Sequence, residues 1–127
     1  MAVGAPVGFR VSSSEAGYGH LYLINADEGV TMLAENLPLA AGAQVDYPRS
    51  GDGVRMQASP PAGIDRLILL VTRQPFVGFA DNQGHTLTRP VALAATAEAF
   101  LRGLNRATER LAAASWAVAE TRVQVVE

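Results

Sequence analysis

The residues best suited to nucleophilic or acid–base chemistry are the two histidines, His20 and His85, and the serine run Ser12–Ser14. A serine nucleophile needs a base within reach and a strained elbow of the form G-x-S-x-G. The serines lack that context and lie at a predicted strand end, where hydroxyl groups commonly satisfy backbone groups. His20 opens a predicted strand and His85 lies in a turn, so we expect both to be structural residues at the surface or at a strand end. The sequence therefore predicts no catalytic residue.

Carboxylates and glycines offer a second kind of chemistry, which is metal or phosphate binding. Asp27, Glu28 and Asp81 lie in predicted turns, and a calcium loop needs more oxygen ligands than the first turn supplies. The two Gly-x-Gly stretches, Gly17–Gly19 and Gly51–Gly53, precede no helix, as a phosphate-binding loop would require. We therefore expect no metal and no cofactor.

Composition narrows the class of partner. The net charge is −2 and the ten basic residues, all arginine, are dispersed along the chain, which argues against nucleic acid as a partner.

The absence of cysteine excludes disulfides and thiolate metal sites. The apolar run Leu67–Val71 is too short to cross a membrane. Residues 1–8 lack the features of a signal peptide, so the compartment stays open between the bacterial cell envelope and the cytoplasm.

One row of charge has a regular spacing. Arg102, Arg106 and Arg110 recur every four residues within a predicted helix, opposite its apolar face, and we call them the arginine row. Like charges at this spacing cost the helix a few tenths of a kcal/mol per pair, and only Glu98 clearly offsets them. The row is thus a candidate binding surface for a protein with an acidic surface, although the solvated back of a helix has the same pattern.

Strands must form most of the scaffold, because apolar residues alternate or form short continuous runs. Val7–Ser13 predicts a first strand, and His20–Ala26, apolar on both faces, predicts a strand buried on both sides. A tight turn at Asn25–Gly29 then leads into Val30–Leu33, so the two segments should form a hairpin. Prolines and glycine in Ala34–Pro48 predict mostly loop. Further along, we expect a short strand at Val54–Ala58. Ser59–Arg66 should form a rigid turn, because its consecutive prolines exclude a central strand. A central strand is expected at Leu67–Thr72, ended by Pro75, and a turn at Asp81–Gly84.

The period then changes to that of a helix, with apolar residues at three- and four-residue spacing. Thr96 is a suitable N-cap, and the helix should span about 96–114, followed by a last strand at about 117–126. We expect residues 1–127 to form a single mainly β (α+β) domain, with residues 1–6 flexible. Its architecture should be β-sandwich-like, with antiparallel sheets, one amphipathic C-terminal helix and a final strand.

The stretch from Gly17 to Pro75 resembles the bacterial family called domain of unknown function 4384. The resemblance rests on Gly19–Asp27, Gly29–Leu33, Leu39–Gly42, Pro48, Pro61–Asp65 and Leu67–Thr72. In that family the hairpin is usually followed by an aromatic or aliphatic residue, proline and asparagine, whereas this chain has Ala34-Glu35-Asn36. The resemblance implies a β-sandwich-like accessory domain, commonly attached to kinases, caspase-like peptidases or exported envelope proteins, and it supplies no catalytic residue.

These observations leave three classes of function. The first is a non-catalytic interaction module that docks to a larger bacterial machine or a partner enzyme, using a surface such as the arginine row or a sheet edge. The second is a small-ligand or glycan binder that uses the loops at one end of the sandwich. The third, a hydrolase, would need a site without any recognisable motif. The sequence favours the first and leaves the partner and the oligomeric state open.

Overall fold

A computed structural model describes residues 8–47, 63–75, 78–80, 82, 85–111 and 116–125 of the chain. Its elements in chain order are β1 (Phe9–Ser12), β2 (Gly17–Ile24), β3 (Gly29–Leu39), β4 (Gln44–Tyr47), β5 (Gly63–Thr72), β6 (Val91–Thr96), α1 (Ala97–Glu109) and β7 (Trp116–Val125).

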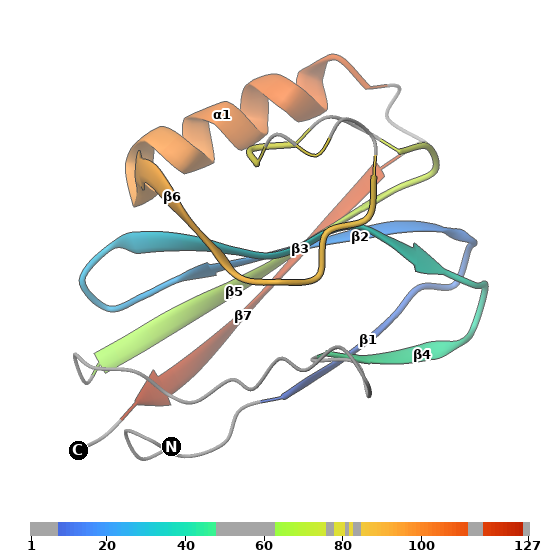
Figure 1. Cartoon of the computed structure of the whole chain (residues 1–127), viewed down its shortest axis with the longest axis horizontal. Coiled ribbons are helices and arrows are strands. Elements are labelled where there is room, and N and C mark those ends of the chain that lie inside the picture. The colour runs from blue at the N-terminus through green and yellow to red at the C-terminus, as the bar shows by residue number, and fades with distance from the viewer. Residues whose placement is uncertain are drawn as a thin grey trace.

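The strands form two antiparallel sheets. The larger has the order β6-β3-β2-β5-β7, and the smaller consists of β1 and β4. Helix α1 covers one face of the larger sheet, and the β1–β4 pair lies on the opposite side (Figure 1). The predicted class is confirmed: the domain is mainly β and sandwich-like, with one helix near the C-terminus and a strand after it.

Each face of the larger sheet has its own apolar core, because a sheet covered on both sides must bury both sets of side chains. The core under the helix consists of Tyr22, Ile24, Val30, Met32, Ile68, Leu70, Ala97, Phe100 and Leu104. The core under the small sheet consists of Val11, Leu21, Leu33, Ala34, Leu37, Leu39, Tyr47 and Leu67. Residues of β2 contribute to both cores, as predicted for a strand buried on both sides.

The segment Ala34–Pro48, predicted to be mostly loop, is largely strand. β3 continues to Leu39, and after a turn at Gly42 (φ 72°) the chain forms β4. Pro38 is tolerated within β3 because it pairs only with Tyr18 of β2, and β6 pairs with β3 only at residues 29–32. Among the described residues, no strand lies beside Pro38 on its other side, so its missing N–H costs no ladder bond there.

Two further boundaries differ from the predictions. β5 begins at Gly63, so Gly63–Arg66 is interior strand paired with β7, although Ser59–Arg66 was predicted to be a turn. The error came from extending the effect of the two prolines, which remove only their own ladder donors, over the following residues. β6 was not predicted at all. The expected strand at Val54–Ala58 and the expected flexibility of residues 1–6 lie outside the described residues.

Helix α1 begins directly after Thr96, the predicted N-cap. The Thr96 hydroxyl oxygen accepts a hydrogen bond from the backbone N–H of Ala99 at 3.2 Å, which satisfies one of the free donors of the first turn. α1 ends at Glu109, before the predicted limit of 114, and β7 spans 116–125 where about 117–126 was predicted. Phe100 and Leu104 are buried against the sheet, so the predicted amphipathic orientation is confirmed.

Candidate functional site

The most polar part of the interior lies where β2 and β3 lose their regular register. Gly19 pairs with Leu37, but Leu21 pairs with Ala34 and Tyr22 with Met32, so β3 has extra residues at two places. Each extra residue changes the face of the sheet to which the following side chains point. Asn36 adopts φ 55° at this irregularity, a left-handed conformation that asparagine accepts more readily than most residues. The bulges bury Glu35 and Asn36 in mid-strand.

The Glu35 carboxylate accepts hydrogen bonds through both of its oxygens. Oε2 accepts from the Tyr22 hydroxyl and from the backbone N–H of Phe79 at 2.8 Å, while Oε1 accepts from Asn82 Nδ2 at 3.1 Å and from the backbone N–H of Ala80 at 3.3 Å. We call this set the Glu35 network. The chain passes so close that a β-carbon at Gly78 would overlap the carboxylate. Glu35 therefore fixes the segment after β5 onto the sheet.

The Glu35 network has no room for acid–base chemistry on a substrate. Burial, together with the charge and hydrogen bond of Glu35, raises the pKa of Tyr22 far above its usual range, so the phenol stays protonated and donates. Tyr22 and Glu35 are both without solvent exposure. A general acid or base must come within hydrogen-bond distance of a reacting group, and these atoms are already bound inside the core.

His20 is fully buried, which contradicts the predicted position at the surface or at a strand end. Its neighbours fix its tautomer. Nδ1 accepts from the backbone N–H of Asn36 at 3.0 Å, and Nε2 lies 2.9 Å from the Thr72 hydroxyl, which itself donates to the Gln74 carbonyl at 2.7 Å. Nε2 must therefore carry the proton. Burial lowers the pKa of His20 to about 3, so the imidazole is neutral and structural.

Acid should destabilise the fold through this imidazole. Its pKa is 6.5 when it is free and about 3 in the fold, so between these values the unfolded chain binds a proton that the folded chain does not. The free energy of unfolding therefore decreases as the pH falls below 6.5, by about 2 kcal/mol between about pH 7 and about pH 5. Urea unfolding at both pH values should show this loss in the native protein and a clearly smaller loss in His20→Gln, whose amide keeps a donor and an acceptor. Equal losses in the two proteins would contradict the assignment.

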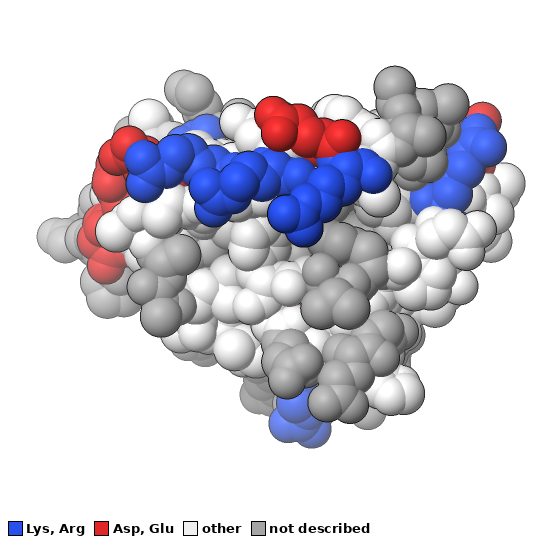
Figure 2. Space-filling view, turned by 90° about the horizontal axis from the view of Figure 1, so that it is seen from above, with Lys and Arg blue, Asp and Glu red and all other residues white. Residues whose placement is uncertain are grey.

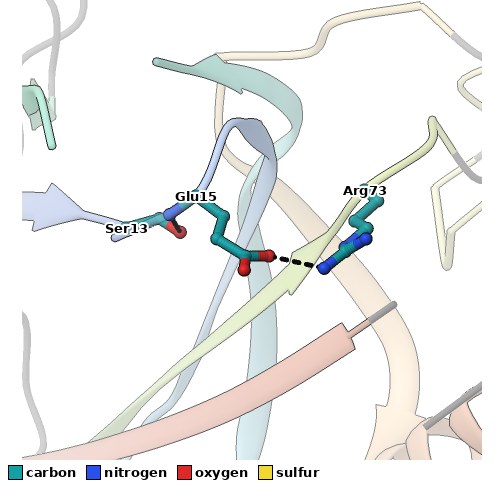
Figure 3. A network of polar contacts seen from close by, with 3 residues as sticks. All are labelled: Ser13, Glu15 and Arg73. Atoms are coloured by element: carbon teal, nitrogen blue, oxygen red, sulfur yellow. Dashed lines mark hydrogen bonds and ion pairs between the residues drawn. The ribbon is translucent and has the colours of Figure 1, made fainter. Parts of the chain in front are cut away.

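Three other polar residues considered from the sequence, Ser13, Asp27 and His85, lie outside the helix and strands. The Ser13 hydroxyl accepts from the backbone N–H of Glu15 at 3.3 Å, and Asp27 Oδ1 accepts from that of Gly29 at 2.9 Å. Figure 3 shows that Glu15 also reaches Arg73 at the end of β5, with 2.8 Å between Oε2 and Nη2. His85 is exposed, and its backbone N–H donates to the Asn82 carbonyl, as in a turn. The strand-end interpretation is confirmed for Ser13, and the turn interpretation for Asp27 and His85.

The arginine row is exposed along the outer side of α1. Arg102, Arg106 and Arg110 all face solvent, and Figure 2 shows basic side chains in a row across the helix side of the molecule, with acidic groups at one end and beside it. Within the described residues, only Arg102 of the three forms an ion pair, with Glu98 at 3.3 Å. The predicted geometry is therefore present, whereas the binding role stays a prediction.

Two classes of site can be assessed within the described residues. No group of three or more histidine, cysteine, aspartate or glutamate residues there is arranged to hold a metal ion. The helix that the structure describes is too short and too polar to cross a membrane.

The described residues form a small sandwich-like domain with a buried polar interior and a row of exposed arginines on α1. The chain belongs to the family described as domain of unknown function (DUF4384), whose model matches residues 1–75. No curated protein and no solved structure matches it significantly. The matched part ends with β5, so α1, the arginine row and β7 lie outside it.

Sequence reasoning missed the Glu35 network. One signal was present: Glu35 and Asn36 interrupt an otherwise apolar run between Met32 and Leu39, which is unusual for an exposed loop. The partners of Glu35 are 13 to 47 positions away in the sequence, at Tyr22, Phe79, Ala80 and Asn82, so local pattern alone could not pair them with it.

Proposed function

We propose that this domain is a non-catalytic accessory module that docks to another protein, a larger assembly or a partner enzyme, through the arginine row on α1. The observation that carries the proposal is the row itself: three exposed guanidinium groups on one side of a helix, of which one has a carboxylate partner in the described residues. The partner surface would be acidic.

The arginine row contributes little to the stability of α1. Arginines four residues apart repel each other mildly, which offsets part of the favourable interaction that Arg106 in the last turn and Arg110 at the C-cap make with the helix dipole. Exposed ion pairs such as Glu98–Arg102 contribute little to stability. A binding role would explain the arrangement, because each guanidinium group can form paired hydrogen bonds with a carboxylate of an acidic partner.

The helix that carries the row is packed on the sheet. Phe100 and Leu104 lie on the opposite side of α1 and are buried in the core, with 1% and 5% of their surface exposed. The helix therefore presents its arginines at fixed spacing, which reduces the entropy lost on binding. The reactive groups of the interior, His20 and Glu35, are held in the core, which supports docking over catalysis.

The test compares two triple variants with the native protein. In the first, all three residues of the arginine row become glutamate. In the second, the charge change is the same but falls on three exposed arginines elsewhere, Arg10, Arg73 and Arg89. A pull-down from the native host identifies the partner, and its affinity is then measured at several salt concentrations after circular dichroism has shown an unchanged fold.

We expect the row variant to lose roughly tenfold or more in affinity and most of its salt dependence, because exposed charges steer association and are screened by salt. The control variant should stay close to the native affinity. Equal losses in both variants, or no loss in either, would remove the row as the docking surface.

A further inference from the structure

The ring of Phe79 packs against α1 beside the arginine row. Its centroid lies 4.8 Å from that of Phe100 and 5.4 Å from that of Tyr22, and its backbone N–H is held by Glu35, yet the side chain is only partly buried. On the helix its neighbour is Gly103, where an added β-carbon would lie 3.0 Å from Phe79 Cε1. The helix therefore has no side chain over the ring at this position.

The position of Gly103 connects the ring with the arginine row. Glycine inside a helix lowers its stability relative to alanine, and the close approach of Phe79 explains why this one lies in the middle of α1. Residues three and seven positions apart share one face of a helix, so Arg106 and Arg110 lie on the same side as Gly103. Helical side chains also lean toward the N-terminus, which directs Arg106 over the turn that contains Gly103. The partly exposed ring thus adjoins the row.

We propose that the arginine row and the Phe79 ring form one docking surface, and that its partner is an acidic segment of another protein with an apolar side chain beside its carboxylates. This inference rests on the proposed docking function and extends it. Exposed ion pairs alone contribute little free energy. Arginine and aromatic side chains, in contrast, are enriched among the few residues that carry most of the binding energy of an interface.

A second copy of α1 does not fit as the partner of this row. Glu98 lies four residues before Arg102 and continues the row toward the helix N-terminus, so the line has one negative charge followed by three positive charges. Antiparallel packing of two such lines in full overlap would set Arg102 opposite Arg106 of the other copy. Parallel packing in register would set each arginine beside its counterpart. Both arrangements bring like charges together, so the carboxylates must come from a different sequence.

Two synthetic helical peptides serve as probes. Both carry glutamate at every fourth position of one face, which repeats the rise of about 6 Å between successive arginines of the row. Leucines flank the glutamates in one peptide, and serines take their places in the other. Fluorescence anisotropy measures the affinity of each peptide for the native chain. We expect the leucine peptide to bind roughly tenfold more tightly, because its leucines bury apolar surface against Phe79.

Three variants of the protein locate this preference. Phe79→Ala removes the ring, and Gly103→Ala places a methyl group against it. Both should bind the leucine peptide only as tightly as the serine peptide, while the serine peptide binds as it does to the native chain. Gly103→Ala also raises the helix propensity of α1, so a lost preference there does not come from a weakened helix. Asn105→Ala, exposed on the other side of α1, is the control and should keep the native preference.

The row variant should bind neither peptide, because it lacks the charges that both peptides need. Equal binding of the two peptides to the native chain would overturn the proposal, as would a full leucine preference in Gly103→Ala and in a folded Phe79→Ala. Binding of neither peptide to the native chain would overturn it as well. None of these three results removes the arginine row as a docking surface, which the pull-down and the row variant decide separately.

Discussion

Replacing Glu35 with alanine should lower the free energy of unfolding by about 3–5 kcal/mol, because removal of one partner from a buried charged network leaves the others without acceptors. The four donors that lose their acceptor are the Tyr22 hydroxyl, the Asn82 amide and the backbone N–H groups of Phe79 and Ala80. Urea unfolding followed by circular dichroism measures the loss. Glu109→Ala, at an exposed position of α1, is the control and should change stability little.

Glu35→Gln separates shape from hydrogen-bonding capacity. The glutamine has nearly the same volume, but its amide group replaces one of the two accepting oxygens. Each oxygen of Glu35 accepts from one backbone N–H, of Phe79 or of Ala80. In either orientation of the glutamine amide, its NH₂ group would therefore face one of these backbone N–H groups, and neither could accept. The loss should therefore lie between zero and that of Glu35→Ala. A loss below about 1 kcal/mol for Glu35→Ala would contradict a stabilising role of the network.

Replacing Phe100 with alanine should also cost about 3–5 kcal/mol, the usual range for removing a buried aromatic ring. The Phe100 ring is 1% exposed and lies 4.9 Å from that of Tyr22 and 4.8 Å from that of Phe79 between centroids. The cavity would thus open where the helix, the sheet and the segment after β5 meet. Thermal and urea unfolding give the loss.

Phe100→Leu is the matched variant for this site, because it removes the aromatic contacts and keeps a branched apolar side chain that fills most of the space. It should cost clearly less than Phe100→Ala. Similar losses for the two would mean that the ring contacts, rather than the filled volume, hold α1 on the sheet. A loss below about 1 kcal/mol for Phe100→Ala would contradict the core position of this ring.

The sequence by itself determined those features that depend on near neighbours. Alternation of apolar residues located β1, β2 and the start of β3, and a change of period located α1 with its cap at Thr96. The same helical spacing set the arginine row on the side opposite Phe100. These features are fixed by backbone geometry within a few residues, so the class of fold and the candidate docking surface could be inferred without a structure.

Only the tertiary structure decided which polar residues lie inside. Ala34–Leu39 has the proline of a loop, yet it is strand because β2 pairs with it and the small sheet covers it. Glu35 and His20 have ordinary surface-residue types, yet both are fully buried. The physical reason is that a buried polar group is stable only when its hydrogen bonds are satisfied. Here the partners come from segments distant in sequence, such as Thr72 for His20 and Asn82 for Glu35, and only folding brings them together.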